Sequence, residues 1–278
     1  KIGGSDKCYQ IVSDGHEEIA TLIESSEEGK EEVASLFNIC GGSQALGKEK
    51  NVRHWIGNGV IYIPADSNDP SCKEEICNIE KICVFLIEQN ENSTAMENLA
   101  AVANIQNNGP CKNIEWDLLL AFMASSHSQI FGLRSWFWQT CTEFGYFITC
   151  GLDSSCPYAK GYFTIDDHYE LCATAYGIEK DLVMTSIQDT INYYGGWDME
   201  GTRIISTNGN VDPWSSLAIT GDKGTLLQPT WWAIGVSHHF WTHEVKESDG
   251  EDVCEARAVI HDQVIQWLIP FTTVVKNY

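Results

Sequence analysis

The chain of 278 residues lacks a hydrophobic run long enough to cross a membrane, and it has few basic side chains. Its longest apolar stretches, such as residues 82–87 and 264–271, fall short of the roughly 18–20 residues that a bilayer span needs. Lysine and arginine number 17 against 39 aspartates and glutamates, which gives a net charge of −22. A chain this acidic is repelled by phosphate backbones and anionic lipid headgroups, so we expect no nucleic-acid partner and no membrane span.

Cysteine, by contrast, is abundant, with 11 residues spread along the chain. This number favours disulfides and a secreted or lysosomal setting. Because 11 is odd, at least one sulfur must be free or must pair with another chain or a missing part of this one. Cys72 and Cys77 have no second close pair behind them, which disfavours a zinc site. Asn92 begins an Asn-Ser-Thr acceptor for N-glycosylation, which fits secretion.

The pattern of apolar residues divides the chain into a helical part, residues 1–195, and a C-terminal α/β part, residues 196–278. The first part predicts an amphipathic helix pair over 16–37 and a further helix near 96–105. The aromatic-rich stretch 116–147 predicts a buried helix that lines a pocket, or else simply core. The second part predicts strands at 203–206 and 231–236 and a final helix over 256–268, with one apolar face packed on a sheet. This order is typical of the last units of an α/β sheet that follow an inserted helical cap.

Two loops in the C-terminal part carry candidate catalytic residues. Asp212 lies in a Gly/Pro-rich turn directly after the first predicted strand, where α/β sheets place functional groups. His238 follows the second strand, and aspartate before histidine is the order in which α/β-hydrolases deliver the acid and base of their triad. The alternatives are an ordinary turn for Asp212 and a core or capping histidine for His238.

Two other catalytic patterns are incomplete in this sequence. His239 and His243 are four residues apart, but a zinc-protease motif needs glutamate where Phe240 stands, so we expect no metal. A hydrolase nucleophile needs Gly-x-Ser-x-Gly between a strand and a helix, and no such sequence occurs. Ser43, after two glycines, comes nearest, but it follows a helical pattern and is better explained as part of a helix-terminating turn.

These motifs together resemble the prolylcarboxypeptidase family of serine peptidases. The matching segments are NGNVDPW at 208–214, GVSHH at 235–239, WQTCTEFG at 138–145 and YYGG at 193–196. The resemblance implies an α/β-hydrolase with an inserted helical cap, in which Asp212 is the triad acid and His238 the triad base. It also implies that Trp138 and Glu143 belong to the cap segment that faces the substrate.

The same resemblance places the nucleophile half of the enzyme upstream of Lys1. The missing initiator methionine fits a chain that begins after a processing or truncation point. We therefore expect an N-terminal fragment of the same precursor, carrying the nucleophilic serine, as a partner, because half a hydrolase leaves an open sheet edge. A homodimer or larger homo-assembly is also expected.

The predicted function is a serine exopeptidase of the Pro-X carboxypeptidase or dipeptidyl peptidase type, acting on proline-containing peptides. Its acyl-enzyme route needs no cofactor. The alternative is a catalytically inert, secreted structural or filament-forming protein, like the contortin-like members of the family.

Overall fold

The structure is a computed structural model that describes residues 5–63, 68–69, 71–126, 132–221 and 228–272. The chain forms two compact units. Unit 1 consists of Lys1–Ser5, Ile63–Cys83 and Gly195–Tyr278, and unit 2 consists of Asp6–Tyr62 and Val84–Tyr194. Unit 1 thus includes a segment, Ile63–Cys83, that the sequence analysis had assigned to the helical part. The reading of 1–195 as a cap and 196–278 as a hydrolase part stays a prediction.

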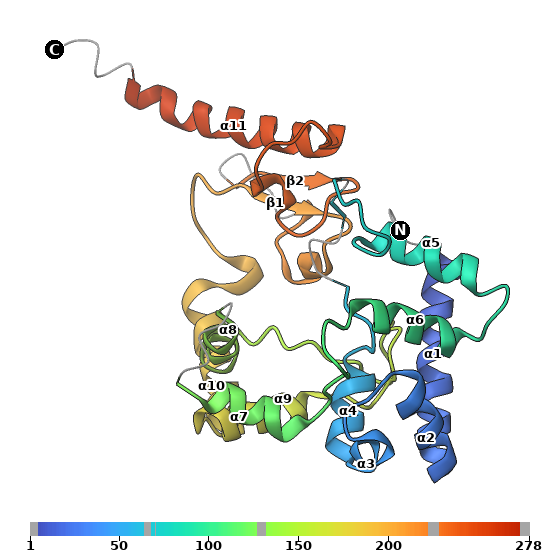
Figure 1. Cartoon of the computed structure of the whole chain (residues 1–278). Helices are drawn as coiled ribbons and strands as arrows, with labels where there is room; N and C mark the ends of the chain where they lie inside the picture. The colour runs from blue at the N-terminus through green and yellow to red at the C-terminus, as the bar shows by residue number, and fades with distance from the viewer. Residues whose placement is uncertain (1–4, 64–67, 70, 127–131, 222–227, 273–278) are drawn as a thin grey trace. The chain divides into compact units, whose positions relative to one another are not determined.

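Unit 2 is built from helices (Figure 1). The predicted pair over 16–37 is confirmed as two helices, separated at Ser26, whose hydroxyl caps the second by accepting from the Gly29 amide at 3.0 Å. The predicted helix near 96–105 is confirmed, and it begins with a capping box formed by Thr94 and Glu97. The helices are α1 (Asp6–Ser25), α2 (Glu27–Leu36), α3 (Gly42–Leu46), α4 (Glu49–Gly57), α6 (Ala95–Gln106), α7 (Trp116–Ala124), α8 (Leu133–Gln139), α9 (Ile165–Tyr176) and α10 (Lys180–Tyr194), with a π-helical turn, η2 (Thr140–Phe144), after α8. Helix α5 (Ile79–Gln89) begins in unit 1 and ends in unit 2.

One part of the core of unit 2 forms where α1 packs against α2 and α6, and a second part lies between α7 and α9. The helices approach closely at Gly15, where an added Cβ would lie 2.6 Å from Leu99 Cδ1. Three disulfides tie the loops and helices of this unit, Cys40–Cys111, Cys141–Cys172 and Cys150–Cys156. The cysteine count had favoured disulfides, and these bonds confirm that prediction.

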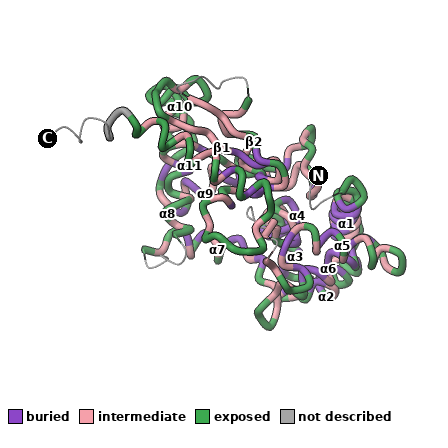
Figure 2. The backbone as a smooth tube through the Cα atoms, turned by 90° about the horizontal axis from the view of Figure 1, so that it is seen from above, coloured by how far each residue is buried: buried purple, intermediate pink, exposed green. Residues whose placement is uncertain are grey.

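The prediction of one buried helix over 116–147 is wrong. The stretch contains α7, α8 and η2, and residues 127–131 lie outside the described part. Helix α7 buries Trp116, Leu120 and Met123, whereas α8 buries none of its residues. The tube of α10, which contacts η2, is likewise mostly exposed or half-buried (Figure 2). Aromatic content alone therefore overstated how deeply this segment is buried.

Unit 1 contains a small parallel sheet. Strands β1 (Ser206–Gly209) and β2 (Thr230–Ala233) pair in register from Ser206 with Thr230 to Gly209 with Ala233. The strands predicted at 203–206 and 231–236 are thus present, displaced by up to three residues. The short helices η3 (Gly196–Asp198), η4 (Pro213–Leu217) and η6 (Phe240–Thr242) and the long helix α11 (Glu251–Thr272) complete this unit. As described, the chain is mostly helical with a small sheet.

Helix α11 packs on β2 through its first turns only. Val253 and Ala256 are buried with Ala233, Val236 and Phe240 in one cluster. The prediction that the apolar face continues onto a sheet is wrong for the second half of the helix, where Val264, Ile265, Leu268 and Ile269 are exposed. The sulfur left over by the odd cysteine count is that of Cys254, which is free and exposed on this helix. Within the described ranges, no helix combines the length and the apolar character that crossing a membrane requires.

Candidate active site

The turn after β1 places Asp212. Gly209 ends the strand, and a Cβ there would lie 1.9 Å from the carbonyl oxygen of Val236, so only glycine fits. The backbone then turns toward the loop that follows β2, because the Val211 amide donates to that same carbonyl at 3.2 Å. Asp212 follows as the N-cap of η4, with Pro213 in the first position. The Gly/Pro composition that suggested a turn therefore also fixes the direction of the aspartate.

The loop after β2 places His238. Gly235 has a left-handed backbone (φ +76°), and it leads from the strand into buried Val236 and Ser237. His239, with φ +41°, then turns the chain into η6. His238 is thus held between a buried anchor and a sharp turn, which limits where its ring can lie.

The structure brings Asp212 and His238 together. His238 Nδ1 lies 2.9 Å from Asp212 Oδ2, and the other carboxylate oxygen, Oδ1, accepts from the Trp214 amide at 2.8 Å. The aspartate side chain is 6% exposed and that of the histidine 35%. A buried carboxylate that accepts from Nδ1–H assigns the hydrogen to Nδ1 and leaves Nε2 as the proton acceptor. This is the arrangement of a base with its orienting acid.

Two further histidines line up beside this pair. The ring centroids of His238 and His239 lie 4.4 Å apart, and those of His239 and His243 lie 5.6 Å apart. In the part of the chain that the structure describes, no group of three or more His, Cys, Asp or Glu side chains is arranged to hold a metal ion. Cys72 and Cys77, the other pair weighed for zinc, form a disulfide.

The remaining candidate residues all belong to unit 2. Trp138 lies on α8 and Glu143 in η2, and both are exposed. Asn92 is exposed in the turn before α6. Ser43 lies in the first turn of α3, after Gly41 and Gly42 with positive φ, and not at the end of a strand. The roles predicted for Trp138 and Glu143 stay predictions.

Two asparagines that the sequence analysis missed support the histidine loop. Asn210 Oδ1 accepts from the Gly235 amide at 2.7 Å, and Asn68 Nδ2 donates to the Gly235 carbonyl. Asn210 lies inside the NGNVDPW motif, so the motif gave a signal for it. Asn68 is 167 residues away from Gly235 along the chain, and no local pattern marks it.

Comparison with known proteins places this chain in a family. The family model described as serine carboxypeptidase S28 matches residues 2–260. The chain belongs to this family. S28 peptidases have an α/β-hydrolase-type fold.

Individual relatives of this S28 chain are distant. The thymus-specific serine protease of Mus musculus is 25% identical over 96% of this chain and 53% of its own length. A putative serine protease of Caenorhabditis elegans is 26% identical over 95% of the chain and 54% of its own length. The lysosomal Pro-X carboxypeptidase of Mus musculus is 23% identical over 90% and 49%. The chain therefore spans about half the length of the curated relatives it matches.

Proposed function

We propose that this chain supplies the acid and base of the catalytic triad of a serine exopeptidase. The observation that carries the proposal is the contact between Asp212 and His238, with the carboxylate buried and the imidazole accessible. In this reaction His238 Nε2 takes the proton of a serine hydroxyl as the hydroxyl attacks the peptide carbonyl, and it later gives the proton to the leaving amine. Asp212 holds the ring and stabilises the imidazolium that forms between these steps. The acyl-enzyme route uses no cofactor.

We propose that the nucleophile comes from an N-terminal fragment or segment of the same precursor outside this sequence. In support, the chain contains no Gly-x-Ser-x-Gly and spans about half of its relatives. The sheet of unit 1 gives a second argument. Parallel sheets are usually larger and covered on both faces, whereas Trp232 in β2 and Ile234 just after it are exposed here. Further strands from that segment would cover them.

The proposed substrates are proline-containing peptides, cleaved in the manner of a Pro-X carboxypeptidase or a dipeptidyl peptidase. The name of one relative, a lysosomal Pro-X carboxypeptidase, favours this specificity. Trp138 and Glu143 are the residues we propose to face the substrate; both are exposed and available for contact.

The proposed setting is secreted or lysosomal. The disulfides favour an oxidising compartment, and one relative is named as lysosomal. Asn92, exposed in its turn, is the proposed glycosylation site. A homodimer or larger homo-assembly is proposed as the working state.

The experiment that tests this function compares turnover of a proline-containing peptide by the wild-type protein with its nucleophile segment and by two variants. Asp212→Asn keeps the shape but removes the charge that orients His238, and we expect kcat to fall about 10⁴-fold, as in the serine-protease triad. His238→Ala removes the base and should cost at least as much. His261→Ala, at an exposed histidine on α11, is the matched control and should leave kcat unchanged. Equal rates for His238→Ala and wild type would refute the assignment.

A second function, a structural or filament-forming protein without turnover, is favoured by the absence of a competent serine in this sequence. It predicts large particles in solution and no reaction with a serine-directed phosphonate. A dimer that reacts with the phosphonate would exclude it.

A further inference from the structure

We propose that Asn68 and Asp69 are positioning residues that hold the loop of His238, and that the short segment to which they belong acts as a clasp on the active site. The clasp is defined as Asn68, Asp69 and residues 71–78, closed by the Cys72–Cys77 disulfide. Its role in catalysis rests on the proposed function of His238, but its effect on the geometry of His238 can be measured without turnover.

The clasp first contacts the loop at the backbone of Gly235, three residues before His238. Asn68 Nδ2 donates to the Gly235 carbonyl, while Asn210 Oδ1 accepts from the Gly235 amide at 2.7 Å. Two side chains from distant parts of the sequence thus hold the donor and the acceptor of one residue. Gly235 has a left-handed backbone, which is freely available to glycine, so the hydrogen bonds restrict a residue that would otherwise have wide freedom.

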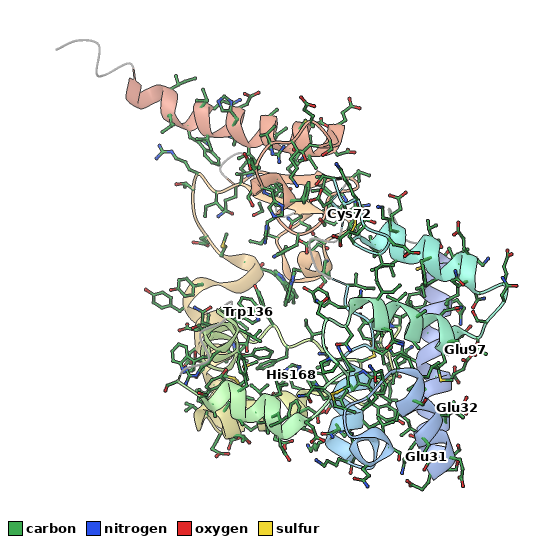
Figure 3. All side chains as sticks on the ribbon, in the orientation of Figure 1. Glu31, Glu32, Cys72, Glu97, Trp136 and His168 are labelled. Atoms are coloured by element: carbon green, nitrogen blue, oxygen red, sulfur yellow. A yellow bond between two sulfur atoms is a disulfide. The ribbon has the colours of Figure 1, made fainter. Side chains whose placement is uncertain are left out.

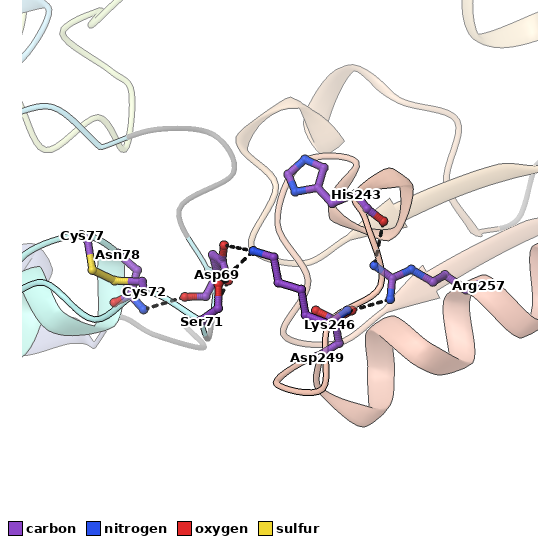
Figure 4. Close-up of polar contacts among 9 residues, drawn as sticks. All are labelled: Asp69, Ser71, Cys72, Cys77, Asn78, His243, Lys246, Asp249 and Arg257. Atoms are coloured by element: carbon purple, nitrogen blue, oxygen red, sulfur yellow. Dashed lines mark hydrogen bonds and ion pairs between the residues drawn. A yellow bond between two sulfur atoms is a disulfide. The ribbon is translucent and has the colours of Figure 1, made fainter.

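The second anchor is Lys246, eight residues after His238. Its Nζ lies 3.0 Å from Asp69 Oδ2 and 2.9 Å from Ser71 Oγ (Figure 4). Burial of Asp69 raises its pKa, but the hydrogen bonds from Ser71 and Lys246 outweigh this, and the pKa lies below its usual range. The aspartate therefore keeps its charge, and the ion pair persists, across the neutral and mildly acidic range.

Hydrogen bonds and a disulfide hold the clasp together. Asp69 Oδ1 accepts from the Ser71 amide at 2.8 Å, and the Asp69 carbonyl accepts from Asn78 Nδ2 at 3.2 Å. The Cys72–Cys77 disulfide closes the turn between these two residues. Because Asn78 is buried at the start of α5, the clasp is fixed to a helix at one end.

Arg257 of α11 holds the same loop from a second direction. Its guanidinium donates to the carbonyls of Trp241 and His243 at 3.0 and 3.1 Å and pairs with Asp249 at 2.5 Å. The clasp thus restrains the loop at Gly235 and Lys246. Arg257 restrains it at Trp241, His243 and Asp249. A catalytic base must be held within about 0.5 Å of its working position, and the clasp supplies restraint that the two-stranded sheet alone does not.

The test follows the reactivity of His238 toward diethyl pyrocarbonate, measured by mass spectrometry of the full chain at one pH, with exposed His261 as the internal reference. We expect Asn68→Ala to raise the rate at His238 about 2- to 10-fold relative to His261, the range that one net hydrogen bond carries. The increase should vanish when Asp212→Asn has already released the ring. Lys73→Ala, at an exposed position of the same clasp, is the control and should change nothing.

An unchanged rate in Asn68→Ala, or the same increase in the Asp212→Asn background, would overturn the proposal, because the effect would not act through the Asp212–His238 contact. Should Asn68→Ala not fold, Lys246→Met removes only the second anchor and carries the same expectation. In the active protein, Asn68→Ala should lower kcat about 10- to 100-fold with KM unchanged. If the rate at His238 changes as expected in these variants but the protein has no turnover, the result would count against the proposed function alone.

Discussion

The close approach of Gly209 to the histidine loop yields a sharp prediction. In Gly209→Ala, the new Cβ would lie 1.9 Å from Val236 O and 2.7 Å from Val236 C. The carbonyl would have to retreat by about 1.5 Å to reach an ordinary van der Waals contact. This movement breaks the 3.2 Å hydrogen bond from the Val211 amide, next to Asp212. Strain from overpacking costs about 1–3 kcal/mol and an unmade buried hydrogen bond about 1–3 kcal/mol.

The expected loss for Gly209→Ala is therefore about 2–6 kcal/mol, a large part of the usual stability of a domain. Urea unfolding followed by tryptophan fluorescence measures it, since Trp231 and Trp241 pack on the core of unit 1. Gly250→Ala is the matched control, because its added Cβ meets open space, and it should cost about 1 kcal/mol or less. If the two variants unfold at the same urea concentration, the described turn between β1 and the histidine loop is wrong.

Three further predictions concern unit 2. Burial lowers the pKa of His16 to about 4, so the unfolded state binds more protons than the folded state between pH 6.5 and 4. The free energy of unfolding should therefore decrease as the pH is lowered through that window, by up to about 1.4 kcal/mol per pH unit. His16→Gln should flatten this slope, measured by urea titration at each pH; an identical slope would contradict the assignment. Asp167→Asn should cost about 1–3 kcal/mol, because the carboxylate accepts hydrogen bonds from an arginine and from the N-cap amide of α9. Exposed Asp166→Asn should cost under about 0.5 kcal/mol in the same thermal melts. Replacing Cys141 and Cys172 by serine opens a bridge of sequence separation 31 and should cost about 3–4 kcal/mol by chain entropy; a melt unchanged from wild type would refute this.

Local sequence patterns predicted the elements that form from local interactions. The α1–α2 pair and α6 follow helical spacing and capping residues, and both are present. The turn and strand signals around Asp212 and His238 placed these residues after neighbouring parallel strands, where they do lie 2.9 Å apart. In each case neighbouring residues determine the result.

Features that depend on long-range packing could not be predicted in this way. Trp136 is 39% exposed on α8, whereas His168 is 5% exposed on α9 (Figure 3). The His168 ring stacks against that of Phe147. No hydrophobic periodicity in the sequence distinguishes the exposed residue from the buried one. The same holds for Asn68, whose partner is 167 residues away, and for α11, whose apolar residues continue beyond the sheet that they were expected to cover.

The central claim is that this chain carries the acid and base for a serine held elsewhere in the same precursor. The most direct measurement is the intact mass of the native protein, reduced and unreduced, after reaction with a fluorophosphonate. The account predicts that a polypeptide segment containing Gly-x-Ser-x-Gly gains the probe, and that His238→Ala abolishes the gain. No gain of mass with that segment present, or an undiminished gain in His238→Ala, would contradict it.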